Sequence, residues 1–465
     1  MPKISRIIQN NFPYPPTAGQ VQLFQLLDEL FDSSSPRATL LVKGYAGTGK
    51  TAALSGLVRI LSLFNYKALL LAPTGRAAKI VAGYTGHAAF TIHKIIYRNI
   101  IDETTGRPIF SLQKNSHKRT VFIVDEASMI QDDENPEGLS VLSDLVEYVF
   151  RHDSNKLILI GDDAQLPPVG RLYSGALDSL NLCDKYNLDV LEVSLHEVVR
   201  QEKDSGILYN ATMVRKMIPR PHGVLQIKTR NFRDVFHISS RELETALQGA
   251  YDEFGLENTV IICRSNKEAV QLNKLIRTRI LFREDDLETG DSVMIVRNNY
   301  FWLGEDSRTG FLTNGDFAEV LKISYREEKS GFMFADLALR LSDYPEQEPF
   351  EAKAILNTLY SQAPSLTADE FKALYDISSP GAGQYVSGGN NSQFKSDPYL
   401  NALQIKFTYA ITCHKSQGGQ WPVVFIKRPY LGNGQADEDY LRWLYTGISR
   451  AVKICYFVDF LEEDI

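Results

Sequence analysis

The sequence predicts an α/β protein with two parallel-sheet cores, a small β-hairpin insert and a small barrel insert. Short runs of aliphatic and β-branched residues alternate with helical stretches along the chain. Such runs are typical of strands that are buried on both faces of a parallel sheet. The first set comprises residues 38–42, 68–72, 121–124 and 157–160, and the second comprises residues 259–263, 403–409, 423–426 and 454–458. Polar or Gly-rich residues follow each run of the first set, which predicts a binding site at the carboxyl ends of these strands.

Two stretches interrupt the predicted cores. Residues 94–118 contain turn-forming residues between apolar ones, a pattern that predicts a β-hairpin. Residues 291–399 begin with short strands and turns, typical of a small barrel, and continue with a helical pattern at 349–362 and 368–375 and a Gly/Ser/Asn-rich loop at 378–396. The predicted domains are therefore 1–93 with 119–195, 94–118, 196–290 with 400–465, and 291–399.

Composition and charge narrow the class of protein. A chain of 465 residues suggests about two to four domains, and its apolar runs are shorter than the roughly 18 residues that a membrane helix needs. The four cysteines have no metal-type spacing and the first residues lack an apolar signal core, so we expect a cytoplasmic protein. The net charge of −7 counts mildly against a nucleic-acid-binding protein, although a local basic groove can act within an acidic chain.

A phosphate-binding loop follows the first predicted strand. Residues 44–51 read GYAGTGKT, which fits the pattern G-x-x-x-x-G-K-[ST], and a helix is predicted at 52–63. In this setting backbone N–H groups surround phosphate oxygens at a helix N-terminus. Lys50 would contact the β- and γ-phosphates of ATP, and Thr51 would hold Mg²⁺. The expected nucleotide contacts are Gly44, Tyr45, Ala46, Gly47, Thr48, Gly49, Lys50 and Thr51.

Two further strand ends carry candidate catalytic side chains. The apolar strand at 120–124 leads into Asp125, which is expected to bind Mg²⁺ directly or through water, and Glu126, which is expected to deprotonate the attacking water. The strand at 157–160 leads into the loop GDDAQLPPV, in which Gln165 is placed to sense the γ-phosphate. Alone, such features are usually a solvated turn and a Pro-stiffened loop. After a phosphate-binding loop they indicate an ATPase.

The order of these and later motifs resembles that of the superfamily 1 helicases. The resemblance rests on residues 16–20 (PTAGQ), 72–79 (APTGRAAK), 161–169 (GDDAQLPPV), 195–201 (LHEVVRQ), 410–421 (AITCHKSQGGQW) and 445–451 (YTGISRA). The motifs at 72–79, 161–169 and 410–421 are similar to those of the subgroup that contains RecD and the phage Dda helicase. The resemblance implies two RecA-like P-loop domains, 1A and 2A, with a hairpin insert, 1B, and an SH3-like barrel insert, 2B.

The resemblance also implies roles for individual residues. Gln20 would hydrogen-bond adenine, and Arg200 and Arg450 would stabilise charge on the γ-phosphate. The implied DNA contacts are Pro73, Thr74, Arg76, Lys79, Thr91 and His93 in the first core, and Asn266, His414, Lys415 and Ser416 in the second. The late motif ends in Gly419-Gln420-Trp421 where the family usually has Gly-Ser-Glu-Phe, so the contact of the usual glutamate is not carried over. The hairpin is a candidate wedge between duplex strands, and Phe110 on its return strand is either an apolar wedge residue or a packing aromatic.

The function that the resemblance implies is ATP-dependent DNA unwinding by a motor that moves 5′ to 3′ on single-stranded DNA. We expect ATP and Mg²⁺ as cofactors, single-stranded DNA, duplex junctions and replication or repair proteins as partners, no membrane, and a monomer. Two alternatives stay open. One is a motor directed to RNA or ribonucleoprotein, because a groove that tracks phosphates reads the backbone more than the bases. The other is a nucleotide-gated interaction subunit of a larger DNA-repair or recombination complex.

Overall fold

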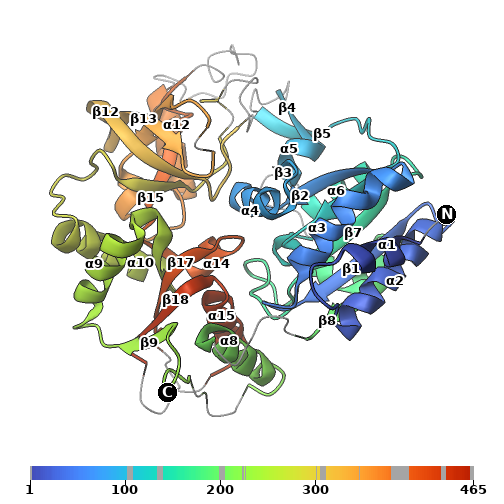
Figure 1. Cartoon of the computed structure of the whole chain (residues 1–465). Coiled ribbons are helices and arrows are strands. Elements are labelled where there is room, and N and C mark those ends of the chain that lie inside the picture. The colour runs from blue at the N-terminus through green and yellow to red at the C-terminus, as the bar shows by residue number, and fades with distance from the viewer. Residues whose placement is uncertain are drawn as a thin grey trace.

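The computed structural model describes residues 3–101, 108–132, 140–197, 205–221, 225, 227–299, 301–303, 311–344, 346–378, 397–430 and 436–460. These residues form two parallel sheets, a closed barrel and a two-stranded hairpin (Figure 1). The predicted fold class is therefore confirmed. Among the described helices, none combines the length and the apolar character needed to cross a bilayer.

The first core is a six-stranded parallel sheet with the order β3-β2-β6-β7-β1-β8. Its strands are β1 (Ala38–Gly44), β2 (Lys67–Ala72), β3 (Ala89–Thr91), β6 (Thr120–Val124), β7 (Lys156–Gly161) and β8 (Asp189–Leu195). Alternate side chains of β1 face opposite sides of the sheet, since Leu40 and Val42 belong to one buried cluster and Leu41 to another. Burial on both faces explains why these strands are continuous apolar runs in the sequence.

Helices cover both faces of this sheet. One buried cluster contains side chains of α1 (Ile4–Asn11), α2 (Ala18–Asp32), α3 (Lys50–Ile60) and α4 (Gly75–Thr85), and the other contains side chains of α5 (Ile92–Ile96), α6 (Val141–Val149) and α7 (Ser179–Asp184). Short 3-10 helices add η1 (Leu61–Phe64), η2 (Ala127–Met129) and η3 (Gly175–Leu177). The apolar residues Leu23, Leu27 and Leu30 recur at helical spacing and give α2 the buried stripe that packs on the sheet.

The second core is a five-stranded parallel sheet with the order β16-β10-β17-β18-β9. Its strands are β9 (Val235–Ile238), β10 (Thr259–Cys263), β16 (Ala410–Thr412), β17 (Trp421–Lys427) and β18 (Ala451–Val458). Helices α8 (Gly206–Met217) and α15 (Glu438–Ile448) share one buried cluster with it, and α9 (Leu243–Phe254) and α10 (Asn266–Leu275) share another. Shorter elements are η5 (Leu256–Asn258), η6 (Ile276–Ile280) and α14 (Cys413–Ser416).

Both inserts have the predicted type of structure. In the first, β4 (Tyr97–Ile101) and β5 (Pro108–Leu112) form an antiparallel hairpin. The second is a closed barrel of β11 (Ser292–Ile295), β12 (Phe317–Lys329), β13 (Phe332–Leu341), β14 (Phe350–Ile355) and β15 (Leu403–Phe407), with the helices α11 (Asn357–Tyr360) and α12 (Ala368–Ser378). The side chain of Phe110 and the loop 379–396 lie outside the described residues.

One predicted strand belongs to a different sheet. Residues 403–409 are predicted to lie in the second core, but β15 pairs antiparallel with β11 and parallel with β14, and so completes the barrel. The short strand β16 takes the place at the edge of the second sheet, beside β10. The barrel insert therefore extends past its predicted end at residue 399. The other domain boundaries stay a prediction.

A predicted helix is also wrong in its first half. Residues 349–362 are predicted as helix, but 350–355 form β14 and only 357–360 are helical. Side chains of a strand alternate between two faces. Ala352 and Ala354 accordingly join the barrel core, while Lys353 between them pairs with Glu327 at 2.9 Å and with Asp336 at 2.7 Å. These partners come from β12 and β13, which a local helical pattern does not reveal.

The barrel stands on the second core and the hairpin on the first (Figure 1). Side chains of β12, β13, β10 and β17 belong to one continuous apolar cluster, so the barrel and the second sheet share a core. The loop after β7 also packs on the second core, because Ala164 and Leu166 belong to its other cluster. The carboxyl ends of β1, β6 and β7 therefore lie close to the second core.

Candidate functional site

The loop between β1 and α3 has the backbone conformation that a phosphate-binding loop needs. Gly47 and Gly49 have φ angles of 79° and 80°, a left-handed conformation that favours glycine. At Gly44 a Cβ atom would lie 2.9 Å from Cγ of Lys50, so the absence of a side chain lets the lysine fold back over the loop. This shape allows successive N–H groups to surround an anion at the N-terminus of α3.

Lys50 is held at the loop by backbone oxygens. Its Nζ donates to the carbonyl oxygens of Gly44 and Tyr45, the latter at 2.9 Å. Thr48 Oγ1 donates to the same oxygen of Tyr45 at 2.9 Å and tightens the loop. Within the described residues no carboxylate forms an ion pair with Lys50, so its charge fits a phosphate group.

Gln20 joins the start of α2 to this loop. Its Nε2 donates to the carbonyl oxygen of Thr48 at 3.1 Å, and its Oε1 accepts the backbone N–H of Thr17 at 3.1 Å. The second bond completes a capping box at the N-terminus of α2. Gln20 therefore lies at the nucleotide loop as the sequence predicts, and its contact with adenine stays a prediction.

Asp125 and Glu126 follow β6. Oδ1 of Asp125 accepts the backbone N–H of Glu126 at 2.9 Å, and Oδ2 accepts the phenol of Tyr84 from α4. Glu126 has a φ angle of 53°, which is uncommon for a residue with a side chain and turns the backbone sharply. Such a conformation persists only where the surrounding structure fixes it, and it is frequent at functional sites.

Arg450 reaches from the second core to Glu126. It follows α15, is 3% exposed, and its Nη1 lies 3.9 Å from Oε1 of Glu126. Bonds to the carbonyl oxygens of Thr446 at 3.1 Å and Gly419 at 3.3 Å fix the guanidinium. Burial raises the pKa of Glu126, and the charge of Arg450 lowers it in part. A carboxylate with a raised pKa is suited to accept a proton from water.

Gln165 lies in the loop after β7, and this loop is bonded to the second core. Leu166 donates its N–H to Oγ1 of Thr446 at 2.9 Å, and its oxygen accepts Nε2 of Gln417 at 2.6 Å. Gln165 is 6% exposed, and its Oε1 has no hydrogen-bond partner in the part of the chain that the structure describes. Leaving a buried acceptor unpaired costs free energy. The site therefore offers an acceptor for a donor from outside the chain, such as a water molecule.

Tyr445 connects the phosphate-binding loop to α15, a role that sequence analysis does not assign. Its hydroxyl donates to Oδ2 of Asp162 at 2.6 Å and accepts the backbone N–H of Ala46 at 2.9 Å. Nearby, the guanidinium of Arg215 from α8 lies 3.9 Å from the ring centroid of Tyr45. Tyr445 opens the motif at 445–451, but its partners lie far away in the sequence, so only the approach of the two cores reveals the contact.

The residues at these strand ends fit a nucleotide with a divalent cation. Within the described residues Lys50 forms no ion pair with a carboxylate, and Asp125 accepts the phenol of Tyr84, which Thr51 also approaches. Hydroxyl and carboxylate oxygens are ligands that Mg²⁺ prefers. Thr51 and Asp125 would therefore hold the cation beside Lys50. Arg200 lies outside the described residues, and its role stays a prediction.

Arg76 joins three parts of the molecule. It lies in the first turn of α4, where Thr74 caps the helix by accepting the N–H of Ala77 at 3.2 Å. The guanidinium of Arg76 lies 4.0 Å from the ring centroid of Trp421 in the second core and 4.6 Å from that of Phe317 in the barrel. Arg76 thus contacts aromatic rings of both the second core and the barrel, and its contact with DNA stays a prediction.

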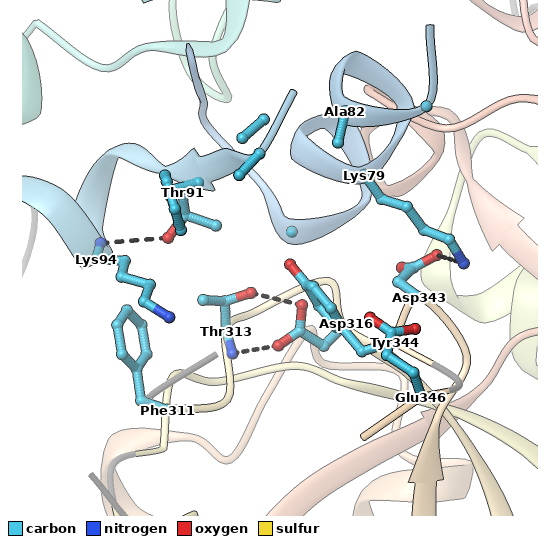
Figure 2. A pocket seen from close by; sticks show the side chains of 15 residues that line it. Lys79, Ala82, Thr91, Lys94, Phe311, Thr313, Asp316, Asp343, Tyr344 and Glu346 are labelled. Atoms are coloured by element: carbon cyan, nitrogen blue, oxygen red, sulfur yellow. Dashed lines mark hydrogen bonds and ion pairs between the residues drawn. The ribbon is translucent and has the colours of Figure 1, made fainter. Parts of the chain in front are cut away.

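A cavity of about 330 Å³ lies between predicted DNA-contact residues of the first core and the barrel. Figure 2 shows Lys79 and Thr91 on one side of it, and Thr313, Asp316 and Asp343 on the other. Lys79 donates to the carbonyl oxygen of Ser342 at 3.0 Å and lies 3.7 Å from Asp343. Two predicted DNA contacts thus share one wall, and one of them is engaged by the barrel.

Asp316 faces the N-terminus of α4. Its Oδ2 accepts the N–H of Thr313 at 2.6 Å and its Oδ1 accepts the hydroxyl of the same residue at 2.7 Å. A Cβ atom at Gly75 would lie 2.6 Å from Oδ1, so the carboxyl group lies against the first turn of the helix. Burial raises the pKa of Asp316 to about 7. The end of the helix that favours an anion is therefore covered by a carboxyl group of the barrel.

The predicted DNA contacts of the second core differ in accessibility. Lys415 donates to Oδ1 of Asn314 in the barrel at 2.5 Å, and burial lowers the pKa of its ammonium group to about 8. Ser416 is fully buried and donates to the carbonyl oxygen of Cys413 at 2.7 Å. Ser416 thus supports its loop, whereas Lys415 lies at the border with the barrel.

The remaining predicted contacts are half-buried. Burial lowers the pKa of His93 to about 4, so its ring is neutral at pH 7, and it lies 5.4 Å from the ring of Tyr97. Burial also lowers the pKa of His414. Pro73 precedes the helix cap, and Asn266 is the first residue of α10. Contacts of these side chains with DNA stay a prediction.

Two protein families and several known proteins are similar to this chain. The AAA domain family matches residues 22–219, and the UvrD-like helicase C-terminal domain family matches residues 407–458. The chain is similar to the ATP-dependent DNA helicase dda of Enterobacteria phage T4, with 23% identity over 95% of this chain and 99% of that protein. It is also similar to the ATP-dependent DNA helicase Pif1 of Psychrobacter sp. (strain PRwf-1), with 24% identity over 82% of this chain and 60% of that protein.

Two further similarities concern an uncharacterised protein and a solved structure. Uncharacterized protein R530 of Acanthamoeba polyphaga mimivirus is 21% identical over 94% of this chain and 98% of that protein. A crystal structure of Pif1 helicase from Bacteroides in complex with ADP-AlF3 and ssDNA has a TM-score of 0.47 and 17% identity, and the match covers 96% of this chain and 93% of that one.

Proposed function

Because the chain belongs to the superfamily 1B helicases of the Pif1, RecD and Dda type, we propose that it is an ATP-driven motor that moves 5′ to 3′ along single-stranded DNA and unwinds duplex DNA. One observation carries the proposal. Glu126 of the first core and Arg450 of the second approach to 3.9 Å beside the phosphate-binding loop. A site assembled from both cores can couple hydrolysis to their relative motion.

Hydrolysis of ATP would use the residues around this pair. The loop N–H groups and Lys50 would bind the phosphates, and Mg²⁺, held by Thr51 and Asp125, would neutralise phosphate charge. Glu126 would accept a proton from the attacking water, which its raised pKa favours. Arg450 would stabilise the negative charge that develops on the γ-phosphate, because its guanidinium is already oriented by Thr446 and Gly419.

Coupling of hydrolysis to motion would pass through the loop after β7 and through Tyr445. The hydroxyl of Tyr445 bonds both Ala46 and Asp162, so a shift of the phosphate-binding loop acts directly on α15. α15 leads into Arg450 and then into β18, the next-to-edge strand of the second sheet. A local change at the nucleotide would thereby displace the second core and the barrel that shares its apolar cluster.

The test is unwinding of matched duplexes with a 5′ or a 3′ single-stranded tail, in DNA and in RNA, by the purified chain. We expect unwinding of the 5′-tailed DNA duplex alone, and ATP hydrolysis that single-stranded DNA stimulates. Lys50→Ala serves as the inactive control. Unwinding of only the 3′-tailed duplex would contradict the polarity. Equal or stronger stimulation by RNA would favour the RNA-directed motor, and nucleotide binding without unwinding would favour the interaction subunit.

A further inference from the structure

Tyr84 lies between the two predicted metal ligands. It is in the last turn of α4, outside every motif of the phosphate-binding site. Its hydroxyl donates to Oδ2 of Asp125, and the hydroxyl of Thr51 lies within reach of the same phenol. The phenol therefore links Thr51 of the phosphate-binding loop to Asp125 at the end of β6. Sequence spacing gives no signal for this contact.

The direction of these hydrogen bonds follows from the chemistry of the side chains. A carboxylate oxygen can only accept a hydrogen bond, so the phenol of Tyr84 donates its proton to Oδ2 of Asp125. Its oxygen remains free to accept the hydroxyl proton of Thr51.

This arrangement suits two oxygen ligands of a cation. A threonine hydroxyl that binds a cation through a lone pair must donate its proton elsewhere, and the oxygen of Tyr84 accepts it. Asp125 keeps lone pairs for the cation, because each of its oxygens accepts one hydrogen bond within the described residues, from the N–H of Glu126 at 2.9 Å and from the phenol. Groups that orient metal ligands in this way tune metal affinity.

We propose that Tyr84 is a positioning residue for Thr51 and Asp125, and that α4 couples this cation site to the DNA-contact residues at its other end. The inference rests on the proposed ATP-driven function. α4 begins at the cap Thr74, carries Lys79 in its middle and ends beside Tyr84. Its 11 residues span about 16 Å. Because its backbone hydrogen bonds hold it as one element, a displacement of its N-terminus by DNA moves Tyr84 as well.

The experiment compares Tyr84→Phe with a matched control, Tyr186→Phe. Tyr186 also donates its phenol to an aspartate of the first core, Asp132, but it lies outside the nucleotide site. Binding of Mn²⁺ to the protein with ADP is measured by electron paramagnetic resonance, which needs no turnover. We expect Tyr84→Phe to weaken Mn²⁺ binding by about tenfold, and Tyr186→Phe to leave it unchanged.

The second readout is the stimulation of ATP hydrolysis by single-stranded DNA. We expect a smaller fold-stimulation in Tyr84→Phe than in wild type or Tyr186→Phe. Unchanged Mn²⁺ affinity would overturn the positioning role, and unchanged stimulation would overturn the coupling by α4. Loss of folding in Tyr84→Phe alone would assign the hydroxyl a structural role and also overturn the proposal. A wild type that hydrolyses no ATP would contradict the proposed function itself, whatever the variants do.

Discussion

Adjacent carboxylates in the site have different surroundings, and this difference assigns their roles. Both oxygens of Asp125 accept hydrogen bonds, from Glu126 N–H and from Tyr84, whereas Glu126 faces Arg450. Glu126→Gln should therefore retain nucleotide binding and lower kcat by at least about 100-fold, because the proton acceptor is lost. ATPase assays and binding of a fluorescent nucleotide measure the two properties. Normal turnover in this variant would refute the assignment of the base.

The substitution Tyr445→Phe tests whether one hydroxyl between the two cores contributes to stability and to ATP turnover. Tyr445→Phe leaves the N–H of Ala46 and the carboxylate of Asp162 without this partner. Loss of a partner for a buried polar group costs about 1–3 kcal/mol. We expect a melting midpoint several degrees lower and slower ATP turnover. The control is Tyr430→Phe, since Tyr430 is 93% exposed. Equal melting of the two variants would argue against a supporting role for the Tyr445 hydroxyl.

Elements of the second core and the barrel are joined by a buried ion pair. Asp291, directly before β11, lies 3.0 Å from Arg277 and accepts the hydroxyl of Tyr409 at 2.9 Å. The side chains of Arg277 and Asp291 are 3% and 0% exposed. Asp291→Ala would leave the guanidinium of Arg277 buried without this anion, and should lower the free energy of unfolding by about 3–5 kcal/mol.

The matched control for this junction is Glu319→Ala, which removes an exposed pair. Glu319 lies 3.6 Å from Arg340, and both side chains are nearly half exposed. Such surface pairs contribute about 0–1 kcal/mol. Urea and thermal unfolding should therefore show a large loss of stability for Asp291→Ala and almost none for Glu319→Ala. Similar losses in both variants would contradict the role of the buried pair.

At the scale of elements, the sequence identifies buried strands but not always their sheet. β1, β6, β7 and β10 are continuous apolar runs because both faces of a parallel sheet are covered. β15 has the same fully buried pattern, yet it closes the barrel. Its partners β11 and β14 lie far away in the sequence, so no local pattern could assign it. The same holds for β14, whose Lys353 is buried only because acidic partners lie on neighbouring strands.

In the nucleotide site, too, local sequence patterns reveal some residues and not others. Lys50, Asp125 and Arg450 occur in contiguous motifs whose spacing carries the chemistry, and the structure places all three around one loop. Tyr84 and Asp316 act through partners that the fold brings together from other elements. Motif spacing therefore predicts candidate residues for the reaction, but not the residues that hold these candidates in place.

In the whole molecule, the barrel contacts residues of both cores that are predicted to bind DNA. Lys79 lies 3.7 Å from Asp343 (Figure 2). Lys415 donates to Asn314 at 2.5 Å, and Asp316 covers the N-terminus of α4. All three positions are suited to phosphate oxygens. A strand of DNA that binds there must replace these contacts, so its affinity depends on how firmly the barrel is docked.

Lys415 and Asn314 allow this competition to be measured. Lys415→Ala should weaken binding of single-stranded DNA and reduce the slope of log affinity against log salt by about one. Asn314→Ala should instead tighten binding by a few fold, because the ammonium group of Lys415 loses its internal partner. Fluorescence anisotropy at several salt concentrations measures both. Weaker binding by Asn314→Ala would show that the asparagine supports DNA binding instead of competing with it.

Docking of the barrel should also depend on pH through Asp316. Burial raises its pKa from the ordinary 3.8 to about 7, and the charge of Asp343 contributes, while Lys79, Lys94 and Glu346 line the same cavity. Between these two pKa values the docked carboxyl group holds a proton that a solvated one has lost. Docking therefore weakens as pH rises through this window, by up to about tenfold per pH unit, and levels off above pH 7.

Single-stranded DNA should accordingly bind more tightly to the wild type at pH 7 than at pH 6. In Asp316→Asn this part of the pH dependence should vanish, because the amide is neutral throughout and keeps the shape of the protonated acid. Anisotropy titrations of both proteins between about pH 5.5 and 7.5, which cover the upper part of this window and its end near pH 7, test the expectation. Since the other charged groups of the cavity are unchanged in the variant, an identical pH profile for the two proteins would assign the dependence to those groups and not to Asp316.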